Sequence, residues 1–286
     1  MGLLFKMFRI KIIFDVHELV HEDLKQKKLL IHPYILGFSY KFFEKSDCKN
    51  FHLILAEKSY KPWYDGRTSH FCIIQNFPRL DIFIPWQLTS RNGGDLLFIG
   101  NLTGKRGLVQ TVKALALLKN QNIRIDLHCI GQNDREAKKM LREIPEFKDV
   151  AGQILFYGYL HIEEAVKISR RCFAGIALPE PLPNHFESWP SKMFEYMALG
   201  LPVIASDFPL YKYVLENCCG IVVDPSNISQ IASAINWLLN NPEEARNMSV
   251  NAVQKVSLNY NWASQEPILL NFYKEVLNEN NYCQPL

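Results

Sequence analysis

The chain has 286 residues, of which 48% are hydrophobic and 21% are charged, and its formal net charge is +3. This balance is that of a soluble globular protein, and so small a net charge argues against a nucleic-acid partner. The length allows one large domain or two domains of moderate size.

The sequence predicts neither a membrane span nor a disulfide framework. No uninterrupted apolar run approaches the roughly 18 residues of a spanning helix, and Lys6, Arg9 and Lys11 interrupt the apolar N-terminal segment. That segment also lacks the small-residue cleavage site of a signal peptide. The 7 cysteines are odd in number and scattered, without the Cys-x-x-Cys spacing of a zinc site. We therefore expect a cytoplasmic protein.

The first part of the chain predicts three strands and one long helix. Apolar runs predict strands over Ile10–Val16, Leu53–Ala56 and Cys72–Ile74, and a helical period covers roughly Asp23–Glu44. Basic side chains surround the aromatic-rich segment Tyr34–Phe43: Lys25, Lys27, Lys28, Lys41 and Lys45. They predict either a face peripheral to the inner side of the membrane, on anionic lipid, or an ordinary solvated helix face. Both interpretations stay open.

A zinc-protease pattern, His-Glu-x-x-His, also occurs in this part, from His17 to His21, with Glu44 downstream as a further ligand. That chemistry needs both histidines one turn apart on a helix. Here His17 directly follows the strand predicted over Ile10–Val16, so the pair straddles the junction of a strand and a loop. We therefore expect no metal, and a zinc protease is the weakest alternative.

A second, longer series begins after a linker that Asn76–Arg79 and Ser90–Gly94 flank. Apolar runs alternate there with helical periods, which predicts a parallel, doubly wound sheet. The expected strands are Leu96–Ile99, Ile125–Ile130, Ile154–Tyr157, Phe173–Leu178, Val203–Ala205 and Gly220–Val223. The expected helices are Leu108–Lys119, Glu136–Glu143, Glu163–Ser169, one that carries Glu195, Tyr211–Glu216, two from Ser229 and Glu243, and Ser264–Asn278.

The turn Gly100–Gly107 joins an expected strand to an expected helix and carries Lys105 and Arg106. A glycine-bearing turn with two cations can hold a diphosphate, and Arg106 can offer two parallel N–H groups to a phosphate. An ordinary basic turn is the alternative. Because open parallel sheets bind ligands beyond the C-terminal ends of their strands, Tyr159 is a candidate contact for a nucleotide base, with packing as its alternative.

The segment that begins at Glu187 is the most informative about chemistry. Pro190 fits the first position of a helix, with Ser188 or Trp189 as its cap, so first-turn N–H groups are left to meet an anion. Glu195 lies about two turns into this helix. Eight residues of helix rise about 12 Å, whereas the two carboxylates of a glycosidase lie roughly 5–9.5 Å apart. The two glutamates therefore suit the two ends of a sugar nucleotide. A capped core helix with two surface acids is the alternative.

These residues also carry a resemblance to a known family. Glu187, Glu195, the run Pro190–Ala205 (Pro-Ser-Lys-Met-Phe-Glu-Tyr-Met-Ala-Leu-Gly-Leu-Pro-Val-Ile-Ala) and Asp224-Pro225 resemble family-four glycosyltransferases, which have the GT-B fold. The resemblance implies an α/β protein with two Rossmann-like domains, of which 1–88 is acceptor-side and incomplete and 89–262 binds the donor. It also implies that the terminal helix, 263–286, packs back on the first domain. The opening elements of the first domain are expected to be missing before Ile10.

The same resemblance implies roles for individual residues. His17 and Glu187 are expected to be catalytic: His17 contacts the donor sugar or its phosphate, and Glu187 faces the hydroxyls of the transferred sugar. Glu195 is expected to bind the ribose hydroxyls. A structural histidine at a strand end is the alternative for His17. Family members commonly carry Arg where this chain has Asn101, so Lys105 is expected to compensate. The donor-binding residues that the resemblance implies are Gly100, Asn101, Lys105, Arg106, Tyr159, Ser188, Trp189, Pro190, Ser191 and Glu195.

The function that the resemblance implies is transfer of a sugar from a nucleotide-sugar donor to a glycan or lipid-linked acceptor, with retention and without a metal or other cofactor. Two alternatives remain. One is a donor-binding module without turnover, which is inactive or needs a partner chain. The other is a sugar-nucleotide epimerase of the same fold, which would convert donor in the absence of any acceptor.

Overall fold

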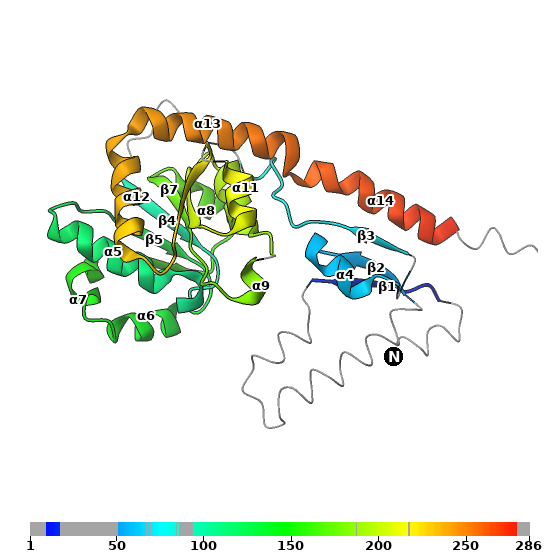
Figure 1. Ribbon diagram of the computed structural model, residues 1–286, viewed down its shortest axis with the longest axis horizontal. Coiled ribbons are helices and arrows are strands. Elements are labelled where there is room, and N and C mark those ends of the chain that lie inside the picture. Colours follow the sequence, from blue (N-terminus) through cyan, green and yellow to red (C-terminus); the bar gives the residue numbers. More distant parts are fainter. Residues whose placement is uncertain are drawn as a thin grey trace, which may run out of the picture. The chain divides into compact units, whose positions relative to one another are not determined.

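A computed structural model of the chain describes residues 10–17, 51–66, 68, 70–83, 85, 94–186, 188–216 and 218–278. The fold divides into two compact units (Figure 1). Unit 1 comprises Met1–Asn76 and Trp262–Leu286, and unit 2 comprises Phe77–Asn261. The helix predicted over Asp23–Glu44, with its lysines and aromatic residues, lies outside the described residues.

Unit 1 contains a parallel sheet in the order β1–β2–β3. The strands are β1 Ile13–Val16, β2 His52–Leu55 and β3 Phe71–Ile73. β1 starts three residues later than predicted, and β2 and β3 each start one residue earlier. The helices that accompany them are η2 Lys58–Tyr60, α4 Lys61–Tyr64 and α14 Trp262–Asn278.

Both faces of this sheet are covered, which is usual for parallel strands. On one face Val16, Leu53, Leu55 and Tyr64 form a buried cluster. On the other, the α14 side chains Phe272 and Val276 pack with Ile54 and Ile74. The side-chain oxygen of Gln265 on α14 also accepts a 3.0 Å hydrogen bond from the backbone N–H of Gln75. A helix from the end of the chain therefore completes the core around strands from its beginning.

The boundary between the units falls earlier than the residue 88 predicted from the sequence. Phe77 and Phe83 pack in the hydrophobic core of unit 2, and Phe77 lies with its ring edge against Phe194, at a centroid distance of 5.0 Å. Burial of these two aromatic side chains draws the segment that contains them into unit 2.

Unit 2 contains a six-stranded parallel sheet in the order β6–β5–β4–β7–β8–β9. The strands are β4 Asp95–Ile99, β5 Leu127–Ile130, β6 Ile154–Gly158, β7 Cys172–Ala177, β8 Val203–Ser206 and β9 Gly220–Val223. Every residue of β5, β7 and β8 is buried, because helices cover both faces of the sheet and leave no solvated side. The chain starts at β4, moves outward to β6, and then crosses back to pair β7 with β4.

Two layers of helices enclose this sheet (Figure 1). The helices are η3 Gly104–Arg106, α5 Leu108–Asn120, α6 Asp134–Arg142, α7 Phe147–Val150, η4 Ala151–Gln153, α8 Ile162–Ser169, α9 Pro183–Phe186, α10 Ser191–Ala198, α11 Pro209–Leu215, α12 Ile228–Asn240 and α13 Pro242–Asn259. The core on one face is built with α5, α6, α7 and α12, and the core on the other with α8, α10, α11 and α13. The prediction of a doubly wound parallel sheet is confirmed.

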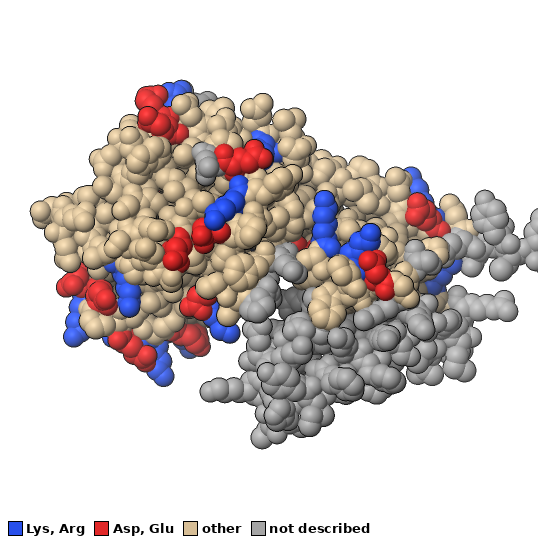
Figure 2. All heavy atoms as spheres, viewed as in Figure 1, with Lys and Arg blue, Asp and Glu red and all other residues tan. Residues whose placement is uncertain are grey.

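Charges of both signs are interspersed on the face shown in Figure 2, in keeping with the small net charge. Within the described ranges, no helix combines the length and the apolar character that a membrane crossing requires.

Candidate functional site

A cavity of about 140 Å³ opens in unit 2 at the C-terminal ends of two neighbouring strands. One part of its lining is the end of β4, from Phe98 to Gly100. Another is the end of β7 and the residues that follow it, from Ile176 to Pro179. The chain runs outward in one direction from β4 and in the opposite direction from β7. Open α/β sheets bind ligands at such a reversal of strand order. We call this space the switch-point cavity.

Five residues that the sequence proposed as donor ligands line the switch-point cavity: Gly100, Asn101, Arg106, Pro190 and Ser191. They come from the turn after β4 and from the start of α10. Lys105, Tyr159, Ser188, Trp189 and Glu195 are not among the lining residues. Glu195 is connected to the cavity through Lys192, which lines it and donates a hydrogen bond to the Glu195 carboxylate.

The turn after β4 packs closely against Leu178, which lines the cavity. Gly107 ends the turn after β4 with φ +87° and caps α5. A Cβ at Gly107 would lie 2.2 Å from the carbonyl oxygen of Leu178, so only glycine lets the turn approach the end of β7 this closely. The approach fixes Arg106, the preceding residue, at the mouth of the site.

Helix α10 begins one residue later than the sequence predicted. Pro190 has ψ 103°, an extended backbone, and is the N-cap rather than the first helical residue. The N–H of Met193 already donates to the Pro190 carbonyl at 2.9 Å. Since Pro190 itself has no N–H, the backbone N–H groups of Ser191 and Lys192 are the ones at the helix start that an anion can meet.

The turn after β4 carries two positively charged side chains. Arg106 and Lys105 are exposed, and within the described residues neither forms an ion pair. The carbonyl of Lys105 accepts the N–H of Glu180 at 2.9 Å, which ties this turn to the segment after β7. The side chain of Asn101 accepts a hydrogen bond from that of Asn133. Arg106 therefore remains available to an incoming anion.

Lys192 also lines the cavity, although the sequence favours a solvated helix residue over a ligand at this position. Its Nζ lies 2.7 Å and 2.9 Å from the two carboxylate oxygens of Glu195. The Lys192 side chain is 39% exposed and that of Glu195 is 14% exposed. The ion pair thus has its carboxylate mostly buried and its ammonium group within reach of solvent and of the cavity.

A buried tyrosine supports the cavity through a hydrogen bond to the end of β4. The backbone N–H of Ile99 donates to the hydroxyl of Tyr196 at 2.7 Å, and Tyr196 is completely buried. Burial raises the pKa of the Tyr196 hydroxyl far above its usual range. This contact joins α10 to the end of β4, so two parts of the cavity wall are held at a fixed separation.

Trp189 belongs to an aromatic cluster instead of the cavity lining. Its ring stacks on Phe194 at 5.5 Å with an interplanar angle of 19° and lies 5.6 Å from Tyr260. Phe77 completes the cluster. Packing of this kind fixes the backbone just before α10, which places Pro190 and Ser191.

His185 lies close to the two cations. Its Nδ1 donates to the carbonyl oxygen of Glu180 at 2.8 Å, since a carbonyl only accepts. Burial, and to a smaller extent the charges of Arg106 and Lys105, lowers the pKa of His185 below its usual range, against the opposing effect of the bond to Glu180. The folded protein thus favours the neutral ring.

We expect the lowered pKa of His185 to make stability depend on pH. The unfolded chain binds a proton at about pH 6.5, whereas the folded chain binds it only at lower pH. The contribution of His185 is therefore complete above about pH 6.5 and is lost as the pH falls through the folded pKa. In urea unfolding at pH 7.5 and 5.5, His185→Gln should lose less stability on acidification than the wild type. Equal losses would contradict this assignment.

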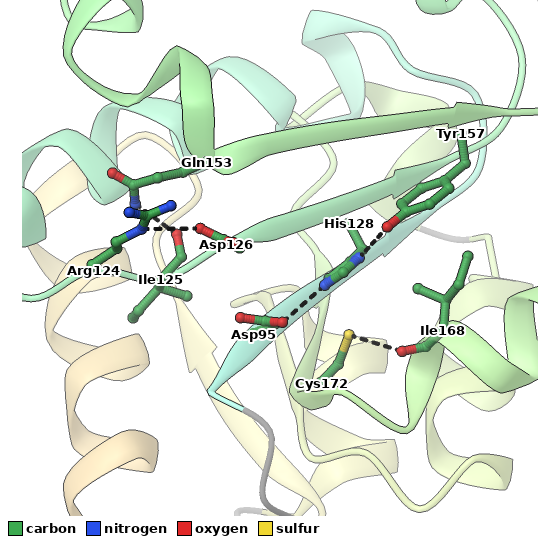
Figure 3. Close-up of polar contacts among 9 residues, drawn as sticks. All are labelled: Asp95, Arg124, Ile125, Asp126, His128, Gln153, Tyr157, Ile168 and Cys172. Atoms are coloured by element: carbon green, nitrogen blue, oxygen red, sulfur yellow. Dashed lines mark hydrogen bonds and ion pairs between the residues drawn. The ribbon is translucent and has the colours of Figure 1, made fainter.

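Three adjacent strands, β4, β5 and β6, share a chain of polar side chains centred on the buried His128 (Figure 3). His128 of β5 bonds through Nε2 to Asp95 at 3.0 Å and through Nδ1 to the Tyr157 hydroxyl at 2.9 Å. A carboxylate only accepts, so Nε2 carries the proton, and Nδ1 of a neutral ring accepts from Tyr157. Tyr157 is the next-to-last residue of β6, and Tyr159, which is 70% exposed, directly follows the strand.

Two proposed residues are placed elsewhere or not described. His17 follows β1 in unit 1, where its Nε2 lies 3.0 Å from Asp15 Oδ2 and its carbonyl accepts the Tyr60 hydroxyl at 3.2 Å. Glu187 and the remainder of the zinc-protease pattern, Glu18 to His21, lie outside the described residues. In the part of the chain that is described, no three His, Cys, Asp or Glu side chains cluster as metal ligands.

Comparison with protein families identifies relatives. The family model described as "Glycosyl transferases group 1" matches residues 84–255. Glycogen synthase of Mycobacterium tuberculosis is 23% identical over 169 residues, which are 59% of this chain and 39% of that protein. Alpha-D-kanosaminyltransferase of Streptomyces kanamyceticus is 23% identical over 197 residues, 66% of this chain and 49% of that protein. The matched region thus spans less than half the length of these relatives.

Comparison with solved structures gives the fold. HepE of Anabaena, in complex with UDP and glucose, superposes with a TM-score of 0.73 at 13% identity. The superposition covers 96% of this chain and 74% of HepE. The parallel sheets and their Rossmann-like arrangement are those of the GT-B fold, as the sequence predicted.

Proposed function

The chain belongs to the group 1 glycosyl transferases, and we propose that it transfers a sugar from a nucleotide-sugar donor to a glycan or lipid-linked acceptor. The observation that carries this proposal is the switch-point cavity. Arg106, Gly100 and the start of α10 meet there, at the reversal of strand order where this class of sheet binds nucleotides.

The cavity offers what a nucleoside diphosphate requires. The Arg106 guanidinium can form two charge-assisted hydrogen bonds with one phosphate. The Ser191 and Lys192 N–H groups, at the positive end of the α10 dipole, can bind the same anion. Glu195 lies one turn further along α10, and its carboxylate suits the ribose hydroxyls. A glycosyl donor leaves its diphosphate behind on transfer, so the groups that bind this anion also stabilise the leaving group.

The proposal also covers the stereochemistry of transfer, its metal dependence and the contacts to the sugar and the base. Transfer proceeds with retention, for which the family resemblance is the support. It needs no metal ion, because Arg106, Lys105 and the α10 dipole supply the positive charge that the leaving group needs. His17 and Glu187 contact the transferred sugar; the family resemblance is the support for these two roles. Tyr159 contacts the nucleotide base, in keeping with its exposed position beyond β6.

Thermal unfolding with UDP, GDP and ADP tests the donor site, and UDP comes first because HepE is bound to it. Ligand at a hundred times its dissociation constant should add about 2.7 kcal/mol to the free energy of unfolding. Arg106→Ala should weaken nucleoside diphosphate binding about 10- to 100-fold, since a bond to a charged group contributes about 1.5–3 kcal/mol. Calorimetric titration measures that change.

Arg142→Ala provides the matched control, because Arg142 is an exposed arginine at the end of α6. It should bind nucleotide as the wild type does. The proposal fails if no nucleotide shifts unfolding of the wild type, or if Arg106→Ala binds as tightly as the control. Binding without sugar transfer, in excess chelator and with acceptor present, would favour the module without turnover. Conversion of donor without acceptor would favour an epimerase.

A further inference from the structure

Lys192 occupies a position that its ion pair with Glu195 does not explain. It is the second residue of α10 and lines the switch-point cavity together with Arg106. Its side chain passes over the end of β4: a Cβ added at Gly100 would lie 3.9 Å from both Cγ and Cε of Lys192. The Lys192 side chain therefore lies against the backbone at Gly100, along the cavity wall.

The ion pair between Lys192 and Glu195 holds the ammonium group beside the cavity without using all of its donors. Lys192 Nζ contacts both carboxylate oxygens of Glu195, at 2.7 Å and 2.9 Å. An ammonium group has three N–H donors, so one remains for another acceptor. Because the Lys192 side chain is more than one third exposed, an anion that enters the cavity can reach its ammonium group.

We propose that Lys192 is a ligand of the donor diphosphate and that it links the phosphate subsite to Glu195. This inference rests on the proposed function. Lys192 and Arg106 supply the cavity with two cations from different elements, one on α10 and one on the turn after β4. When the diphosphate binds, the remaining N–H of the Lys192 ammonium group donates to a phosphate oxygen, and the ion pair with Glu195 is kept. The Glu195 carboxylate is then held beside the ribose hydroxyls.

The arrangement predicts a specific defect in Lys192 variants. Loss of the ammonium group should weaken binding of a nucleoside diphosphate more than binding of the corresponding monophosphate or nucleoside. A lysine that only neutralised Glu195 or supported α10 would change the three affinities by the same factor. The ratio of the affinities therefore separates a phosphate ligand from a structural residue.

The experiment is calorimetric titration of the full chain with whichever of UDP, GDP or ADP the wild type binds best, and with the matching monophosphate and nucleoside. Lys192→Met removes the charge at nearly constant length, Lys192→Gln is a second neutral variant, and Lys192→Arg retains a cation. Lys138→Met is the matched control, because Lys138 is also a helical lysine, 40% exposed and paired with an Asp at 3.2 Å, but lies outside the cavity.

We expect both neutral variants to bind the diphosphate about 10- to 100-fold more weakly, with the nucleoside affinity changed less than threefold. Lys192→Arg and Lys138→Met should stay within threefold of the wild type for every ligand. If the wild type binds the diphosphate and the neutral variants keep the wild-type ratio of diphosphate to nucleoside affinity, the role of Lys192 is overturned while the proposed function stands. If the wild type binds no nucleotide, the proposed function fails and this role fails with it.

Discussion

Replacement of Gly131 by alanine should cost the protein about 3–5 kcal/mol of stability, the largest effect that we expect from a single methyl group. Gly131 follows β5 and has φ +152°, a conformation that side chains rarely adopt. A Cβ there would lie 1.7 Å from the carbonyl oxygen of Gly100. That oxygen is part of the backbone, so the strand ends themselves would have to separate. Strain and overpacking of this kind each cost about 1–3 kcal/mol.

Urea unfolding measures this loss, and Gly152→Ala is its control. Gly152 lies in η4, where a Cβ would meet nothing within 4 Å, so its replacement should change stability by less than about 0.5 kcal/mol. Gly131→Ala should also weaken nucleotide binding, because it displaces Gly100 in the cavity wall. Equal unfolding midpoints for the two variants would contradict the close approach of Gly131 to the carbonyl oxygen of Gly100.

The second large effect concerns the polar chain of Figure 3. His128→Phe keeps a ring in the sheet but removes the hydrogen bonds to Asp95 and Tyr157. The His128 side chain is 1% exposed, so no water can replace its nitrogens. One lost bond involves a carboxylate and the other a neutral hydroxyl, and together they predict a loss of about 2–4 kcal/mol.

Two variants calibrate the result for His128. Tyr157→Phe removes only the neutral hydrogen bond and should cost about 0.5–1.5 kcal/mol. His161→Phe replaces an exposed histidine before α8 and should change stability by less than about 0.5 kcal/mol. If His128→Phe is as stable as His161→Phe, the polar chain does not stabilise the sheet.

The strands of unit 2 were the most predictable part of the fold, for a physical reason. A parallel strand covered on both faces must be apolar along its whole length, and Cys172–Ala177 is an example. Short helices were missed because four residues are too few to show a helical period, as in Phe147–Val150 and Pro183–Phe186. The start of α10 was predicted one residue early because Pro190 fits either the cap or the first turn.

The site was predictable only where sequence motifs mark it. The turn that carries Arg106 and the run from Pro190 are local signals, and both line the cavity. Lys192 was missed because its environment depends on Gly100, which is distant in the sequence. His128 interrupts an apolar strand between Leu127 and Cys129, and this signal marks a buried polar group without naming its partners. Only strand order brings Asp95 and Tyr157 beside it.

The pairing of β4 with β7 has a consequence for how the molecule acquires its site. These strands are neighbours although β5 and β6 lie between them in the chain. The two walls of the cavity therefore belong to segments that leave the ribosome at different times, and such non-local pairing is slow. A nascent chain that has completed only β4 to β6 contains Arg106 but lacks the end of β7 and the start of α10, which also line the cavity. Acquisition of nucleotide affinity during refolding would thus time the closure of the sheet.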